Sequence, residues 1–168
     1  MYLTLALGLL VCSFGAGAHE WKAHWITRAY DCASGTNTWV AFRKSVDIDK
    51  VPARLEARIA ADSKYWLWIN GRMVVTDGGL KRGPAPGDGY YDTLDIAPFL
   101  VPGRNWVSVL VNYFGKNGFS HQNSGSVALL FEAVGDGVEI LSDASWDACV
   151  NFAYGTAPGV NTAILISS

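Results

Sequence analysis

The chain has 168 residues and is 50% hydrophobic, which suits one domain with a single buried core. Its formal net charge is −2, and acidic and basic residues are interspersed with no basic run longer than two residues. Nucleic acid is therefore excluded as an expected partner. Aromatic residues make up 12% of the chain and include seven tryptophans, a high content that a functional interpretation has to explain.

The N-terminus has the pattern of a secretory signal. Leu3–Leu10 is an apolar run that is too short to span a bilayer, and Ala16-Gly17-Ala18 is an A-x-A cleavage signal before a polar residue pair. We predict a cleaved signal peptide at residues 1–18 and an exported domain at 19–168, secreted or periplasmic. Lipoprotein anchoring through Cys12 is the less favoured alternative, because Val11 is a poor residue to precede a lipidated cysteine.

Apolar and polar residues alternate in most of the later segments. Val40, Phe42 and Ile48, for example, share one expected face, while Arg43 and Asp47 share the other. A period of two is typical of half-buried antiparallel strands and not of helices. Strand-like segments lie at residues 23–27, 39–48, 53–61, 63–69, 72–76, 90–96, 106–113, 126–134, 138–141, 145–147 and 162–166.

Turn signals separate these segments. Asn70-Gly71 lies between two apolar runs and predicts a tight hairpin, because both turn positions need positive φ. Gly135-Asp136-Gly137 predicts a second hairpin, and a Gly- and Pro-rich loop occupies residues 78–89. No segment has a convincing helical period. We expect about eight to ten of these segments to form strands, and short strands at this spacing predict an all-β fold, an antiparallel β-sandwich of the jelly-roll type.

Candidate catalytic groups are few. A hydrolase or lyase needs paired titratable groups, or a nucleophile with its base. The histidines are His19, His24 and His121, and the sequence contains no G-x-S-x-G, H-E-x-x-H or P-loop motif. His121 is therefore interpreted as a loop histidine that makes hydrogen bonds.

Carboxylates gather in and beside the 78–89 loop. A glycosidase needs two carboxyls roughly 5–9.5 Å apart in a cleft, and nothing in the spacing brings two together. Asp95 is expected to cap backbone N–H groups. A calcium site is a further hypothesis, with Asp88, Asp92 and backbone carbonyls as ligands, although the D-x-D-x-D spacing is absent.

The aromatic residues fall into two groups. Trp66 and Trp68 share the strand face opposite the core, where they would stack on sugar rings or, as the favoured alternative, be covered by another domain. Tyr90, Tyr91 and Phe119 lie in loops and are better placed for ligand contact.

Cys32 and Cys149 remain after signal cleavage. In an exported protein they would form a disulfide, with two separately buried thiols as an equal alternative. Neither has a zinc-like spacing to another cysteine or a histidine.

Several motifs resemble the N-terminal module of bacterial α-L-rhamnosidases of glycoside hydrolase family 78. They begin with Ala23-His24-Trp25-Ile26-Thr27 and Phe42-Arg43-Lys44. The resemblance continues through Tyr65-x-Leu67-x-Ile69-Asn70-Gly71-Arg72, Gly78-Gly79-Leu80-Lys81-Arg82-Gly83-Pro84, Tyr90-Tyr91-Asp92-Thr93-Leu94-Asp95-Ile96, Gly103-Arg104-Asn105, Tyr113-Phe114-Gly115-Lys116-Asn117-Gly118-Phe119-Ser120-His121 and Ser142-Asp143-Ala144-Ser145-Trp146. The Ile-Asn-Gly hairpin also occurs in sugar-binding domains of β-galactosidase-like enzymes.

The resemblance implies a galactose-binding-like sandwich without catalytic residues of its own. The rhamnosidase reaction, cleavage of terminal α-L-rhamnose, would need an (α/α)₆ barrel beyond Ser168, so the chain is expected to be a fragment that ends before this domain. Its expected partners are this downstream catalytic domain and rhamnose-containing glycans. Some relatives of the module bind rhamnose with a calcium ion.

Two functions remain as hypotheses. The first is an accessory domain that packs on the catalytic barrel and shapes its rim; the second is a carbohydrate-binding module, stand-alone or β-galactosidase-like. A free-standing hydrolase has the least support. The candidate carbohydrate or interface residues are Lys81, Arg82, Asp88, Tyr90, Tyr91, Asp92, Lys116, Asn117, Phe119 and His121.

Overall fold

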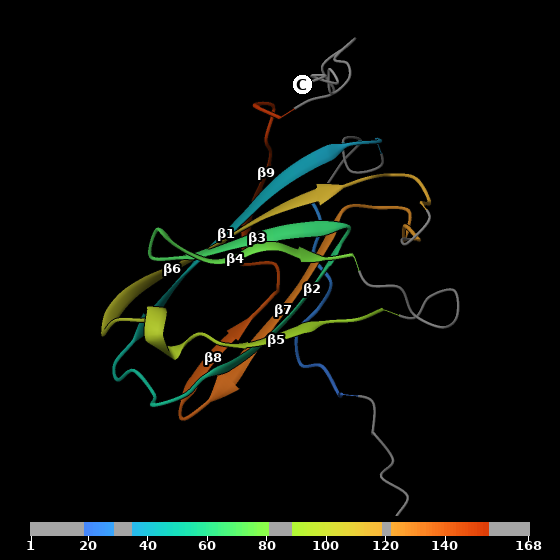
Figure 1. The fold of residues 1–168 in the computed structure, drawn as a ribbon. Coiled ribbons are helices and arrows are strands. Elements are labelled where there is room, and N and C mark those ends of the chain that lie inside the picture. Colours follow the sequence, from blue (N-terminus) through green and yellow to red (C-terminus); the bar gives the residue numbers. More distant parts are fainter. Residues whose placement is uncertain (1–18, 29–34, 81–88, 119–121, 155–168) are drawn as a thin grey trace, which may run out of the picture.

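The computed structural model describes residues 19–28, 35–80, 89–118 and 122–154. Two antiparallel sheets pack face to face in these residues (Figure 1), one five-stranded in the order β4-β3-β6-β1-β9 and one four-stranded in the order β5-β2-β7-β8. The predicted all-β sandwich is thus confirmed. The strands are β1 (Thr38–Ile48), β2 (Glu56–Asp62), β3 (Lys64–Ile69), β4 (Arg72–Gly79), β5 (Asp92–Asp95), β6 (Gly103–Tyr113), β7 (Ala128–Gly135), β8 (Val138–Leu141) and β9 (Asp147–Val150).

Some predicted strands differ from those in the structure. Residues 23–27 form only an isolated bridge, in which Ile26 exchanges hydrogen bonds of 2.8 and 2.9 Å with Leu129. The segment at 90–96 is a strand only over β5, and the segment at 145–147 begins its pairing at Asp147. A short 3₁₀ turn, η1 (Ala97–Phe99), follows β5. The strand predicted at 162–166 lies outside the described residues.

The core forms because alternate side chains of both sheets point into the space between them. On β3, Tyr65, Leu67 and Ile69 are fully buried, and Trp66 and Trp68 alternate with them on the other face. The largest fully buried side chains of the core are Tyr65, Tyr113, Phe42, Phe131, Leu55, Ile59, Leu67, Ile69, Ile96, Leu129, Ile140 and Val40.

Both predicted hairpin turns have the expected backbone geometry. Asn70 and Gly71 have φ values of 52° and 76°, and Asp136 and Gly137 have values of 47° and 79°. Asp95 also acts as predicted, because its Oδ1 accepts from the backbone N–H groups of Leu55 and Ala97, at 2.9 and 3.1 Å. Local turn chemistry therefore sets the connections of the sandwich.

A pair of asparagines fastens the hairpin to the start of β6. The Asn70 Nδ2 donates to the Asn105 Oδ1 at 2.8 Å, and the Asn70 Oδ1 accepts from the Trp106 backbone N–H at 2.9 Å. Asn105 is fully buried, accepts from the Val101 N–H at 2.8 Å, and donates to the carbonyls of Val101 and Gly103. The Ile-Asn-Gly and Gly-x-Asn motifs thus meet in one hydrogen-bonded cluster.

The first part of the N-terminal segment (residues 19–28) lies against the outer side of the four-stranded sheet, and Ile26 farther along lies beside β7 at the edge of that sheet. Glu132 on β7 is buried, and its Oε2 accepts from the backbone N–H groups of Lys22 and Ala23, at 2.6 and 3.1 Å. Its Oε1 lies 2.7 Å from the His19 Nε2 and 4.0 Å from the Arg58 Nη1. Burial opposes the charged carboxylate, but these N–H groups and His19 outweigh it and lower the pKa of Glu132.

We expect Asn105→Ala to lower the free energy of unfolding by about 3 kcal/mol, because it leaves several buried backbone and amide groups without a partner. Urea unfolding of the chain followed by tryptophan fluorescence measures this change. The neighbouring Arg104→Ala is the control: it removes an exposed 3.5 Å pair with Asp47 and should cost less than about 0.5 kcal/mol. Equal losses in the two variants would contradict a structural role for the asparagine cluster.

Glu132→Gln should lower the free energy of unfolding at neutral pH by about 2 kcal/mol, because a neutral amide replaces a carboxylate that accepts from two N–H groups. Since the folded-state pKa is lowered, this stability is present above the unfolded-state pKa, roughly 4.3 for Glu, and is lost as the pH falls through the folded-state value. Urea unfolding from pH 7 to pH 3 should therefore show the two proteins converging. Glu139→Gln, which removes an exposed 3.3 Å pair with Lys22, should change little at any pH.

Candidate functional site

The described candidate residues lie at one end of the sandwich, here called the loop end, where β4 and β6 finish and β1, β5 and β7 begin (Figure 1). Tyr90, Tyr91 and Asp92 precede or open β5, and Lys116 and Asn117 follow β6. The structure thus places five of the ten candidates at the same end. Lys81, Arg82, Asp88, Phe119 and His121 lie outside the described residues.

Asp92 joins the loop end to the core. Its Oδ2 accepts from the Tyr65 hydroxyl at 2.8 Å and from the Gly79 backbone N–H at 3.2 Å. Burial, followed by the hydrogen bond and charge of Asp92, raises the pKa of Tyr65, which keeps this hydroxyl a donor. A Cβ on Gly78 would lie 2.4 Å from the Tyr65 ring, so only glycine fits beside it. Asp92 therefore has a structural role at this end.

The two loop tyrosines have different surroundings. Tyr91 packs edge-on against Trp21 of the N-terminal segment, with ring centroids 5.3 Å apart. Tyr90 is 51% exposed. Of the pair, Tyr90 is the freer to meet a ligand or another domain.

Asn117 orders the connection that leads to β7. Its Oδ1 accepts from the backbone N–H and the Nδ2 of Asn123, at 3.0 and 2.8 Å. The Asn123 Oδ1 in turn accepts from the Tyr113 hydroxyl at 3.0 Å. Burial, with a smaller contribution from the charge of Asp62, raises the pKa of Tyr113. Lys116 is exposed beside this network.

A second surface lies on the outer face of the five-stranded sheet. Trp39 on β1 stacks on Trp66 of β3, with ring centroids 5.3 Å apart, and on Tyr154, which follows β9, at 4.6 Å. The three rings form one continuous aromatic stack. The alternation along residues 63–69 predicted that Trp66 and Trp68 face outward. That Trp39 and Tyr154 lie in the same stack as Trp66 depends on the fold and was not predicted.

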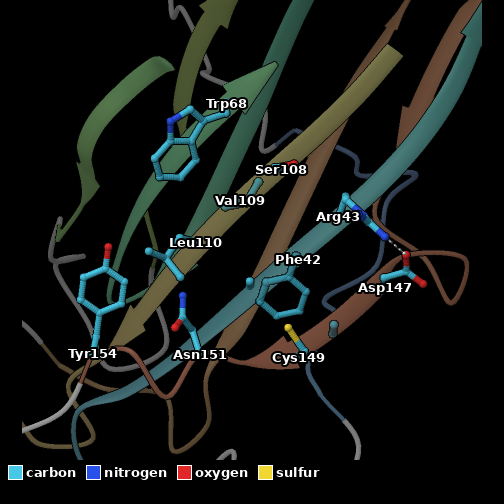
Figure 2. A pocket seen from close by; sticks show the side chains of 12 residues that line it. Phe42, Arg43, Trp68, Ser108, Val109, Leu110, Asp147, Cys149, Asn151 and Tyr154 are labelled. Atoms are coloured by element: carbon cyan, nitrogen blue, oxygen red, sulfur yellow. Dashed lines mark hydrogen bonds and ion pairs between the residues drawn. The ribbon is translucent and has the colours of Figure 1, made fainter. Parts of the chain in front are cut away.

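Beside this stack the sheet forms a hollow of about 730 Å³, here called the outer-face groove. Strand register places Trp68, Ser108, Arg43 and Asp147 in one row across the sheet, and Leu110, Ala41 and Cys149 in the next. Figure 2 shows Trp68 and Tyr154 on one side and Arg43 with Asp147 on the other. The residues that line the groove are Ala41, Phe42, Arg43, Trp68, Ser108, Val109, Leu110, Asp147, Ala148, Cys149, Asn151 and Tyr154.

The charged groups of the groove form one pair. The Arg43 Nη2 lies 3.2 Å from the Asp147 Oδ2, and the guanidinium carbon lies 4.8 Å from the centroid of the Trp106 ring. Asp147 is the only carboxylate among the lining residues. A glycosidase carboxylate pair is therefore not assembled in this groove.

Two other expectations concern metals and cysteines. Within the described ranges, no three His, Cys, Asp or Glu side chains are grouped so that they could hold a metal ion. The calcium and disulfide hypotheses remain predictions, because Asp88 and Cys32 lie outside those ranges; Cys149 is exposed on β9. In the same part of the chain, no helix is long and apolar enough to cross a membrane.

Among solved structures, the chain is similar to the glycoside hydrolase family 78 rhamnosidase of Bacillus sp. GL1, with 34% identity over 79% of this chain and a TM-score of 0.66. The native α-L-rhamnosidase from Aspergillus terreus is similar over 75% of the chain, with 24% identity and a TM-score of 0.58. The chain spans only 14% and 16% of these two enzymes.

A lectin from Pleurotus ostreatus, solved in complex with GalNAc, shares the fold. Its identity is 17%, its TM-score is 0.50, and the match covers 75% of this chain and 35% of the lectin. No protein-family model matches the chain, and no curated protein matches it. The resemblance that the sequence motifs predicted is confirmed: this chain is similar in sequence and fold to part of a glycoside hydrolase family 78 rhamnosidase, and in fold to part of a second α-L-rhamnosidase.

Proposed function

We propose that this chain is an accessory β-sandwich domain of an exported α-L-rhamnosidase-type glycoside hydrolase. In this proposal residues 1–18 direct export. The loop end packs onto a catalytic domain that follows Ser168, and the loop end thereby shapes the rim of that domain's active site. The observation that carries the proposal is the 34% identity to a family 78 rhamnosidase, spread over 79% of this chain but only 14% of that enzyme. A match of this extent fits a module within a larger enzyme.

The loop end suits a fitted contact. Asp92 accepts hydrogen bonds from Tyr65 and Gly79, and Asn117 accepts hydrogen bonds from Asn123. These bonds hold the described backbone of the loop end in place before any partner arrives. Tyr90 and Lys116 are exposed on this ordered frame. Ordered loops with exposed aromatic side chains lose little conformational entropy on binding.

Carbohydrate binding is the second candidate function. The observation that favours it is the outer-face groove, in which aromatic rings lie beside a few hydrogen-bonding side chains. This function does not require a catalytic domain. It is compatible with a stand-alone carbohydrate-binding module or a β-galactosidase-like sugar-binding domain as well as with a rhamnosidase module.

Under the leading proposal, the coding DNA continues in frame beyond Ser168 into a helix-rich domain that carries the catalytic acids. The complete protein should release 4-nitrophenol from 4-nitrophenyl α-L-rhamnopyranoside, and the 168-residue chain should not. Sequencing of the gene and an absorbance assay on both proteins measure this. A stop codon directly after Ser168, or hydrolysis by the short chain, would overturn the proposal.

Tyr90→Ala tests the contact at the loop end. In the complete protein it should lower the Tm of the sandwich by about 3 °C, because it removes a side chain buried against the catalytic domain. In the 168-residue chain the same substitution should shift the Tm by less than about 1 °C, because Tyr90 is already exposed there. Calorimetric scans of both proteins give the comparison. Val101→Ala, exposed at the opposite end, is the matched control and should show no difference between the two proteins.

A further inference from the structure

We propose that the outer-face groove binds one or two rings of a neutral glycan. Trp68 and Tyr154 would provide the aromatic walls, and Arg43, Asp147, Ser108 and Asn151 would bond to the hydroxyl groups. This inference rests on the second candidate function, carbohydrate binding, and is independent of docking to a catalytic domain. The ligand candidates predicted from the sequence lie at the loop end, and sugar stacking on Trp66 and Trp68 was the less favoured interpretation of the outer face. What the structure adds is a groove that combines Trp68 with Tyr154 and the polar residues of β1, β6 and β9.

The groove has the size and lining of a small-ligand site. Its volume of about 730 Å³ lies within the range of roughly 300–1,000 Å³ that is usual for such pockets. Ala41 and Ser108 provide small side chains on the floor, on the neighbouring strands β1 and β6, and Leu110 lies opposite Ala41. The larger Trp68 and Tyr154 lie at the border, as Figure 2 shows. A sugar ring can therefore reach the floor while its C–H face packs on an indole or phenol ring.

The polar groups favour a neutral ligand with several hydroxyl groups. Arg43 and Asp147 carry opposite charges 3.2 Å apart, and no other lining residue is charged, so the lining has no net charge. The pair offers N–H donors and carboxylate acceptors side by side, which matches a hydroxyl that both donates and accepts. Both side chains are more than half exposed, so hydroxyl groups can replace their water without the large desolvation cost of a buried pair.

The groove is also accessible. The N-terminal segment covers the outer side of the four-stranded sheet through Glu132 and Trp21, whereas no described segment crosses the groove. Trp106 and Tyr154 are 40% and 51% exposed at its border. A protein partner would also find aromatic residues here. Protein interfaces, however, are depleted in Asp and Ser relative to the rest of the surface, and Asp147 and Ser108 both line the groove. The lining thus favours a glycan.

Calorimetric titration of the 168-residue chain with L-rhamnose, methyl α-L-rhamnopyranoside, D-galactose and N-acetylgalactosamine tests the proposal. At least one sugar should bind with a saturable signal at millimolar concentration. Trp68→Ala should weaken that binding at least about tenfold, because it removes a stacking surface. Ser108→Leu, which fills the floor and keeps every aromatic ring, should have a similar effect and serves as the second variant if Trp68→Ala does not fold.

Trp25→Ala is the matched control, because Trp25 is 56% exposed and does not line the groove. It should leave sugar binding unchanged. Binding that survives both groove variants would support carbohydrate binding elsewhere and overturn the groove as its site. No binding by any of the four sugars would overturn both the groove and carbohydrate binding, while the rhamnosidase assay would still decide the accessory role. A dimer in sedimentation velocity that Trp68→Ala dissociates would identify a second copy of the chain as the occupant and would also overturn the proposal.

Discussion

The structure of this sandwich depends on the alternating direction of side chains along each strand. Because successive side chains point to opposite faces, each strand has one row of side chains in the core and a second row outside it. The outer rows of side chains on the two sheets have different surroundings. The four-stranded sheet has Glu132 and Leu130 covered by the chain's own N-terminal segment, whereas the five-stranded sheet presents Trp68 and Leu110 in a hollow. The outer face of the five-stranded sheet, which no described segment covers, is therefore the side on which binding is physically reasonable.

The fold was predictable because its determinants are local. Period-two alternation identified the buried row of Tyr65, Leu67 and Ile69, and the Asn70-Gly71 pair identified the hairpin. Both signals depend only on residues that are close to one another in sequence. The segment at 23–27 was assigned wrongly as a strand because alternation alone does not show whether a partner strand is long enough to pair with it. Ile26 makes a single bridge, next to Leu129 where the short β8 has ended.

The candidate site was predictable only in part, because it depends on register between distant segments. Arg43 and Asp147 pair across β1 and β9 and are 104 positions apart in sequence. Sequence showed that Trp66 and Trp68 face outward, but only strand order places Trp39 beside Trp66. Tyr91 illustrates the reverse case. Its loop position suggested ligand contact, and the structure packs it on Trp21, a contact that requires the path of the N-terminal segment.

Motifs that carry the rhamnosidase resemblance mostly serve the architecture. Asn70 and Asn105 bond to each other and to the backbone that leads into β6, while Gly78 makes room for Tyr65 beside Asp92. Of the groove's polar residues, Arg43 belongs to a motif, but Ser108, Asn151 and Asp147 do not. A shared architecture therefore does not imply a shared ligand, since specificity depends on outward-facing residues that the fold leaves free to vary. If the outer-face groove binds sugar as proposed, sugar preference depends on residues other than most of those that make this chain resemble a rhamnosidase module.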